Sequence, residues 1–264
     1  MFQTIAKRTL GAFGATVGVL VLCGLLLGFV EGKSTQYLYG LLGWGGIVFT
    51  GLVGTPVHEL GHFLMCKLFG FHVSEVALFR PIAGRADGVL GYVNYSYDPS
   101  SLWQRLGCFF VGIAPMVLGV AAILLVLRFL TPEVFQSTRE RLAGAVRRGG
   151  GPLELLGAAF TGFFGALVRL RGAALARGIV CLYLVFSIST HMTLSPADLS
   201  GAAVGLVVVA GLCLLFGAVT ALLKVDVVPG LKKTAVTLFA FLSIGTLFAL
   251  LALALFGGLF LILK

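Results

Sequence analysis

Two histidines and a glutamate lie close together inside one of the most apolar parts of the chain. They are His58, Glu59 and His62, in the pattern His-Glu-x-x-His. Histidines four positions apart lie on one face of a helix, so both imidazoles can reach one metal ion. A zinc ion with three protein ligands keeps a fourth position for water, and a nearby carboxylate can take the proton of that water. The motif therefore predicts a single Zn²⁺ and a hydrolytic reaction in which Glu59 is the catalytic base.

The surroundings of the motif argue against a chance occurrence on a buried helix. An ionisable side chain at membrane depth costs several kcal/mol and is rare unless it is paired or functional. Three such groups within five residues need a common partner, and a metal ion supplies it. Gly54 and Pro56 precede the motif, and they predict a kink that leaves room for water beside the site.

The third metal ligand has to come from a distant part of the chain. Asp198 is the strongest candidate, because it follows a proline at the junction of two apolar runs. Its alternative role is an N-cap for a helix that starts near Leu199. His191 is either a residue that supports the ligands, a donor that stabilises an oxyanion, or an ordinary buried histidine. Cys66 lies one turn beyond His62 and fits packing better than ligation.

The composition indicates an integral membrane protein. Of the 264 residues, 59% are hydrophobic and 11% are charged, whereas a soluble domain has about 25% charged residues. The mean hydropathy is +1.07. The formal charge of +9 suggests contact with lipid headgroups, and no nucleic-acid-binding module is present. The five cysteines are scattered without a CxxC pair, which excludes a disulfide framework or a metal knuckle.

Long apolar runs predict an all-α polytopic membrane protein with about six transmembrane helices. Residues 1–264 are expected to form a single membrane domain, with a retained N-terminal anchor rather than a cleaved signal peptide. Polar breaks are expected at 31–36 and 224–233. The predicted spans are 11–30, 39–69, 104–128, 175–194, 201–223 and 235–262, and the predicted parts are an anchor helix and loop at 1–38, a catalytic core at 39–205 and C-terminal helices at 206–264.

A small β-hairpin is predicted between the His-Glu-x-x-His span and the next one. Residues 73–79 and 89–97 are rich in β-branched and aromatic side chains, and turn-forming pairs lie between them. Proteolysis needs an extended substrate, and an exposed strand edge can bind one through backbone hydrogen bonds. An ordinary hairpin that caps the bundle is the alternative, and His72 is expected at its surface. The residues proposed to line the substrate are Gly91, Tyr92, Val93, Asn94 and Tyr95.

The metal site also constrains the membrane topology. His58 and Asp198 can meet only if both lie near the same side of the membrane, so the chain between them must cross the membrane an even number of times. The spans 104–128 and 175–194 satisfy this condition. The apolar stretch 153–170 is therefore expected to be an interfacial or re-entrant helix rather than a crossing; otherwise, Asp198 is not a ligand.

The chain resembles the site-two proteases, which are zinc metalloproteases that cut within or next to the membrane. The resemblance covers roughly residues 40–205 and rests on His58 to His62, on the Gly91-Tyr92-Val93 strand, on Gly112 to Pro115 and on Asp198. It implies that His58, His62 and Asp198 bind zinc, that Glu59 is the base and that the β segment lies along the substrate. The chain departs from the family at Ser195 to Gly201, where Leu-Asp-Gly is usual, and it lacks a PDZ insertion.

The resemblance also implies partners and a location. We expect a membrane protein or peptide as substrate, contact with the lipid bilayer, no nucleic acid, and a multi-pass protein of a bacterial cell membrane that a regulatory membrane partner can control. The motif end and the hairpin would face the cytoplasm.

Other function classes use similar residues. A zinc protease that processes prenylated tails would take its third ligand from a glutamate, and Glu154 is the only late candidate. A catalytically inactive metal-binding scaffold or transporter is a further alternative, although a transport site needs no base at position 59. A di-iron lipid desaturase needs many histidines, and the chain has four.

Overall fold

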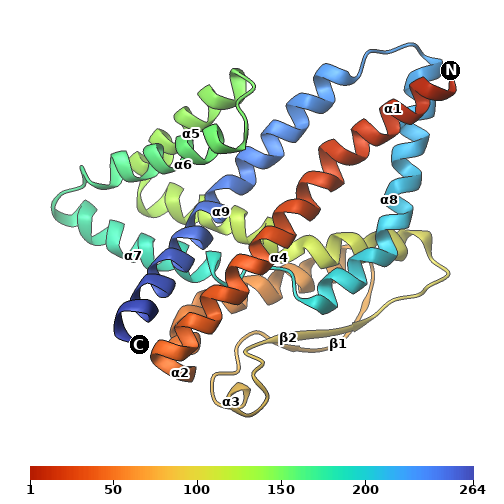
Figure 1. The fold of residues 1–264 in the computed structure, drawn as a ribbon. Coiled ribbons are helices and arrows are strands. Elements are labelled where there is room, and N and C mark those ends of the chain that lie inside the picture. The colour runs from red at the N-terminus through yellow and green to blue at the C-terminus, as the bar shows by residue number, and fades with distance from the viewer.

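The computed structural model describes all 264 residues as a helical bundle with one small hairpin (Figure 1). Five helical stretches are long and apolar enough to cross a membrane, as in a multi-pass membrane protein. The predicted six spans become five because the first two belong to one helical stretch, Phe2–Leu68. The elements are α1 (Phe2–Phe13), a π-helical turn (Gly14–Gly18), α2 (Val19–Leu68), β1 (His72–Ala77), α3 (Gly84–Asp87), β2 (Tyr92–Ser96), α4 (Leu102–Leu130), α5 (Pro132–Arg147), α6 (Pro152–Leu167), α7 (Gly172–Ser189), α8 (Pro196–Leu222) and α9 (Val228–Leu263).

The polar break predicted at 31–36 is wrong, because helix α2 continues through these residues. Lys33, Thr35 and Gln36 are exposed, whereas Ser34 and Glu31 have partners inside the bundle. The Ser34 hydroxyl donates to the Val30 carbonyl at 2.9 Å, and the Glu31 carboxylate accepts from the backbone N–H of Thr193 at 3.2 Å. The anchor helix of the predicted segment 1–38 therefore has no loop at its end.

The chain bends inside α2 at Gly43. This residue has φ 61° and ψ −153°, a backbone conformation that only glycine adopts without strain. The bend divides α2 into a first arm, residues 19–42, and a second arm, residues 44–68. The second arm folds back beside the rest of the bundle (Figure 1), and it carries the His-Glu-x-x-His motif.

The other long helices begin at recognisable N-terminal signals. The Ser101 side chain accepts a hydrogen bond from the Gln104 N–H at the start of α4. Proline lies in the first turn of α8 and of α9, where its missing N–H has no intrahelical partner to lose. The break between α8 and α9 covers residues 223–227 and overlaps the predicted break 224–233 only at 224–227, because α9 already begins at Val228.

The predicted stretch 153–170 corresponds to α6, which is too short to be among the five candidate spans. Its 16 residues extend roughly 24 Å, less than the about 30 Å of a hydrocarbon core. Helix α6 packs side by side with α5 at one side of the bundle (Figure 1). This agrees with the prediction that the stretch is not a full crossing.

The predicted β-hairpin is confirmed. Strands β1 and β2 pair in antiparallel register, with an irregularity between Val73 and Glu75. In the connection, the Asp87 carboxylate accepts from the Val89 N–H at 2.9 Å and from Arg80 at 3.0 Å. These bonds, the backbone one foremost, hold the pKa of Asp87 below its usual value. The connection is thereby fixed where it leads into β2.

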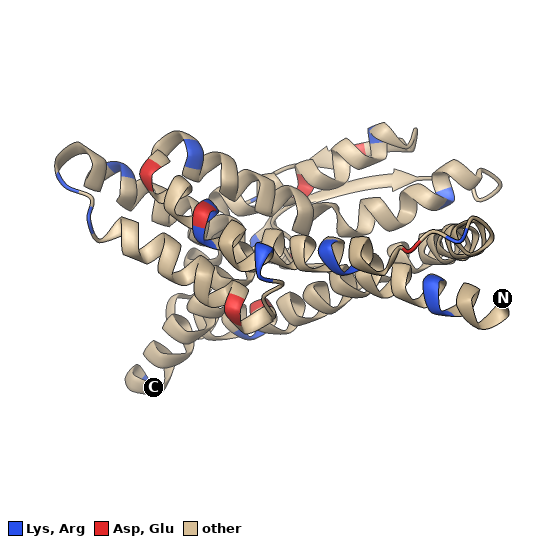
Figure 2. Ribbon diagram, turned by 90° about the horizontal axis from the view of Figure 1, so that it is seen from above, with Lys and Arg blue, Asp and Glu red and all other residues tan.

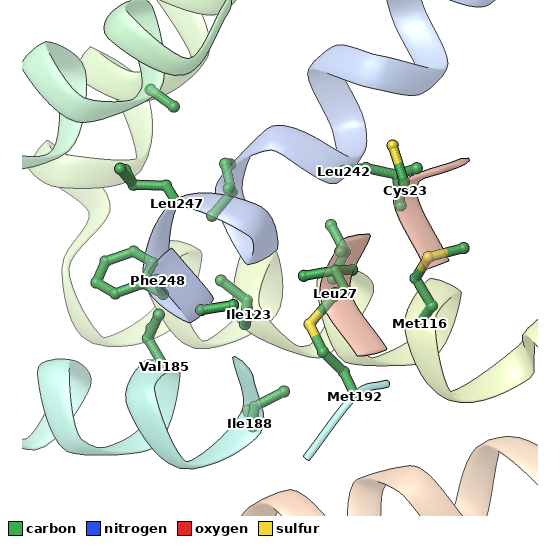
Figure 3. Packing of buried hydrophobic residues seen from close by; sticks show 14 of the residues in the cluster. Cys23, Leu27, Met116, Ile123, Val185, Ile188, Met192, Leu242, Leu247 and Phe248 are labelled. Carbon is green, nitrogen blue, oxygen red and sulfur yellow. The ribbon is translucent and has the colours of Figure 1, made fainter. Parts of the chain in front are cut away.

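The main core joins α2, α4, α7 and α9 through interlocking side chains such as Leu27, Ile123, Ile188 and Phe248 (Figure 3). Met192 belongs to the same core and is 1% exposed, although it lies in the segment between α7 and α8. This side chain anchors the segment 190–195, which we call the site loop.

Charged residues are sparse on the long helices, and most of the ribbon in Figure 2 carries none. This distribution fits helices that face lipid along much of their length. Charged residues inside the bundle are therefore unusual, and each one needs a partner or a task.

Candidate metal centre

Three atoms that could bind a metal ion, from two distant segments, converge at one point. The Nε2 atoms of His58 and His62 lie 3.1 Å apart. Asp198 places Oδ1 3.2 Å from His62 Nε2 and Oδ2 4.0 Å from His58 Nε2. Tetrahedral zinc with bonds of about 2.0–2.1 Å separates neighbouring ligand atoms by about 3.3 Å. His58, His62 and Asp198 form a group that could hold a metal ion.

The other nitrogen of each imidazole is held by a backbone carbonyl. His58 Nδ1 donates to the His191 carbonyl at 2.7 Å, and His62 Nδ1 donates to the Val111 carbonyl at 3.0 Å. Since a carbonyl oxygen only accepts, both Nδ1 atoms carry hydrogen. In the neutral rings the Nε2 atoms therefore present lone pairs, which is the tautomer that metal ligation requires.

The convergence of these lone pairs fits a cation. Two unprotonated nitrogens and a carboxylate oxygen repel one another at distances near 3 Å unless a positive charge lies between them. His62 is 5% exposed and Asp198 is 8% exposed, so water screens this repulsion only weakly. The donor set, two imidazoles and one carboxylate, is one that zinc accepts in catalytic sites.

Asp198 has a second task besides facing the histidines. Ser195 is the N-cap of α8, and its side chain and that of Asp198 bond reciprocally to backbone N–H groups in a capping box. The backbone N–H of Ser195 donates to Asp198 Oδ2 at 2.7 Å. The N-cap alternative for Asp198 is thus corrected: Ser195 is the N-cap, the helix starts at Pro196, and Asp198 supports the cap from inside the helix.

Close helix packing brings Asp198 to the motif. Helix α4 approaches the first turn of α8 at Gly112, where a Cβ would lie 2.6 Å from the Asp198 carbonyl oxygen. A larger residue at this position would therefore push the two helices apart. Helix α4 also supplies the Val111 carbonyl that binds His62. The contact at Gly112 therefore brings Asp198 of α8 close to the part of α4 that orients His62.

The kink predicted at Gly54 and Pro56 is wrong in its position, because α2 departs from helical dihedrals only at Gly43. The helix is nevertheless modified one turn before the motif. The Ser187 hydroxyl of α7 donates to the Thr50 carbonyl at 2.5 Å and accepts from the Gly54 N–H at 3.0 Å. It bridges two groups that an α-helix normally joins directly. Helix α7 is thereby fixed against the second arm.

A cavity of about 260 Å³ adjoins the candidate metal centre, and His58 is the one candidate ligand that lines it. Glu59 lines it and is 7% exposed. Thr55 also borders the cavity, and its hydroxyl is buried without a hydrogen-bond partner. The remaining lining residues come from α2, the site loop and the segment before β2: Glu31, Thr35, Ile47, His58, Gly88, Leu90, Gly91, His191, Thr193 and Ser195.

His191 lies in this cavity, and its backbone has a task of its own. The carbonyl orients His58, whereas the ring nitrogen Nδ1 lies 3.2 Å from the Ser187 carbonyl. The first of these contacts comes from the backbone rather than from the ring, so the supporting role predicted for the histidine side chain stays a prediction. The role of the ring as an oxyanion donor stays a prediction.

The hairpin reaches the site through Gly91. A Cβ on this residue would lie 2.8 Å from Cγ of Glu59 and 2.9 Å from Cγ2 of Thr55, so the backbone before β2 packs directly on the candidate base. β2 pairs with β1 on one edge only. The remaining residues assigned to substrate, Tyr92, Val93, Asn94 and Tyr95, belong to this strand, and their contact with substrate stays a prediction.

The other candidate ligands lie elsewhere. Cys66 is fully buried in a small cluster with Phe69, Phe71, Cys108 and Val111, which confirms packing. The Glu154 carboxylate is paired with Arg148 at 2.6 Å and does not belong to the metal-binding group. His72 begins β1 and is exposed, as expected.

Sequence reasoning missed Glu31 and the two backbone carbonyls. Glu31 left a signal, because it is an isolated carboxylate between long apolar runs, and such groups mark functional sites in membranes. The carbonyls of Val111 and His191 left no signal in the sequence, since every residue has a backbone carbonyl.

No protein-family model, curated protein or solved structure matches this chain. The functional conclusion therefore rests on the geometry of the site and on the chemistry of its residues.

Proposed function

We propose that this protein is an intramembrane zinc metalloprotease, similar to the site-two proteases, that hydrolyses a peptide bond within or near a membrane segment. One observation carries the proposal: the histidines of a His-Glu-x-x-His motif and a remote aspartate converge on one point, with Glu59 in the adjoining cavity. A metal-transport site would need the three ligands but would not need a carboxylate beside them.

In this proposal each residue has one task. His58, His62 and Asp198 hold the zinc ion, which when bound makes water more acidic and polarises the substrate carbonyl. Glu59 accepts the proton of the attacking water and delivers it to the leaving nitrogen. The His191 and Val111 carbonyls keep the imidazoles in the ligating tautomer.

The free edge of β2 supports the substrate part of the proposal. A helical substrate has its peptide groups bonded internally, so cleavage requires an extended segment. An extended segment can add to the unpaired edge of β2 through backbone hydrogen bonds. Because Gly91 contacts Glu59, a segment bound along this strand runs toward the candidate base.

Metal removal tests the proposed function. Purified protein in detergent should contain one zinc ion and cleave members of a panel of synthetic peptides copied from membrane helices. Treatment with 1,10-phenanthroline should remove the metal and stop cleavage, and added Zn²⁺ should restore it. Mass spectrometry of the products measures the result. Cleavage that persists in metal-free protein would contradict the proposal.

Gly91→Ala is expected to reduce kcat by roughly 10-fold to 100-fold, because a displacement of about 1 Å at a catalytic group has effects of this size. The added methyl group would overlap Glu59 and Thr55, whereas the metal ligands are not touched. Zinc content should therefore stay full. Gly45→Ala is the matched control, since a Cβ there meets nothing within 4 Å. Equal rates for the two variants would show that Gly91 does not position Glu59.

A further inference from the structure

The cavity at the metal centre contains a carboxylate for which hydrolysis has no use. Glu31 comes from the first arm of α2, yet it lines the same cavity as His58, Glu59 and His191. The chain bends at Gly43, and residues of both arms line this space. Glu31 thus faces the place where a substrate would lie.

We propose that Glu31 binds a positively charged side chain of the substrate, so that the enzyme selects peptides with lysine or arginine close to the cleaved bond. This inference rests on the proposed function and adds a specificity to it. It also assigns a task to the one acidic residue of the first arm.

The charges around the cavity support a cationic ligand. No lysine or arginine lines the cavity, and none of the ion pairs in the structure includes Glu31. A divalent metal with neutral imidazoles contributes two positive charges, whereas Asp198, Glu59 and Glu31 contribute three negative ones when ionised. The site then has a net charge of −1, which one positively charged group of a substrate would neutralise.

The position of Glu31 favours recognition over a purely structural role. Its Oε2 accepts from the Thr193 N–H at 3.2 Å, and this bond fixes the carboxylate against the site loop. A neutral acceptor could make the same bond. An acidic group at this depth is costly when it lacks a counter-charge, and a substrate cation removes that cost during binding.

Two zinc-binding probes separate charge recognition from hydrophobic contact. One is a hydroxamate with a butylammonium tail, and the other has a pentyl tail of the same length without charge. Isothermal titration calorimetry on the zinc-loaded full chain in detergent gives both dissociation constants without any need for turnover. The quantity compared is the ratio of the two constants.

Glu31→Gln keeps an oxygen for the Thr193 N–H but removes the charge. The preference of the native protein for the ammonium probe, relative to the pentyl probe, should fall roughly 10-fold to 100-fold in this variant, while the affinity for the pentyl probe stays the same. Glu140→Gln makes the same change on the exposed surface of α5 and should retain the native preference.

Each outcome decides the matter. An unchanged ratio in Glu31→Gln overturns the proposal and leaves the protease assignment intact. Equal loss of affinity for both probes also overturns it, because Glu31 then acts on the shape of the site. If neither probe binds the native protein, the zinc centre and the Glu31 proposal fail together.

Discussion

Glu59→Gln should lower kcat by about 10²- to 10⁴-fold, the range over which general acid–base groups contribute, while zinc content remains at one ion per chain. Glutamine matches glutamate in size but cannot accept the proton of water. None of the three ligands is changed, because Glu59 lies outside the group formed by His58, His62 and Asp198. Cleavage rates on one peptide and metal analysis of the same preparation measure both effects.

The result is informative only if the substituted protein is folded. The melting temperature of zinc-loaded Glu59→Gln should therefore equal or exceed that of the native protein, since a buried acidic group, 7% exposed, is replaced by an uncharged one. If the variant cleaves as fast as the native protein, Glu59 is not the base.

Asp198→Ala should weaken zinc binding more than about 100-fold, because loss of a direct ligand exceeds the 10- to 100-fold effect of losing a supporting contact. Cleavage should be lost with the metal. The two imidazole nitrogens lie 3.1 Å apart and repel each other unless a cation lies between them. Without the carboxylate, the site would hold that cation less tightly. Competition with a fluorescent zinc chelator measures the affinity.

Asp198 also belongs to the capping box of α8, so its substitution has a structural component. Ser195→Ala isolates that component, because it removes the hydroxyl that accepts from the Asp198 N–H at 3.1 Å and leaves both ligand oxygens. It should lower the free energy of unfolding by about 1 kcal/mol and leave zinc affinity within a few-fold of native. If Asp198→Ala retains native zinc affinity, the third ligand is another residue.

Much of the fold could be predicted because membrane helices depend on local composition. Long apolar runs identified each of the five candidate spans, and β-branched residues with turn signals identified the hairpin. Helix α6 is too short to be a candidate span, in agreement with the prediction that residues 153–170 do not cross the membrane. The bend could not be predicted, since Gly43 is one of 37 glycines and lies inside an apolar run.

The convergence of the candidate metal ligands could be predicted because they are rare side chains in this sequence. His58, His62 and Asp198 are conspicuous in an apolar sequence, and the structure brings them together. The polar residues from Glu31 onward were misinterpreted as a loop because the partner of Glu31 is distant. Glu31 bonds to Thr193, which lies 162 positions later, and no local pattern encodes that distance.

The imidazole supports of this site have a consequence for how the protein tolerates sequence change. The acceptors that orient His58 and His62 are main-chain oxygens of positions 191 and 111. A substitution of Val111 that keeps the path of α4 therefore leaves its acceptor in place, whatever side chain it introduces. The tautomers of His58 and His62 depend on backbone shape. This part of the candidate centre is therefore robust to point mutations that would disable a support built from a carboxylate side chain.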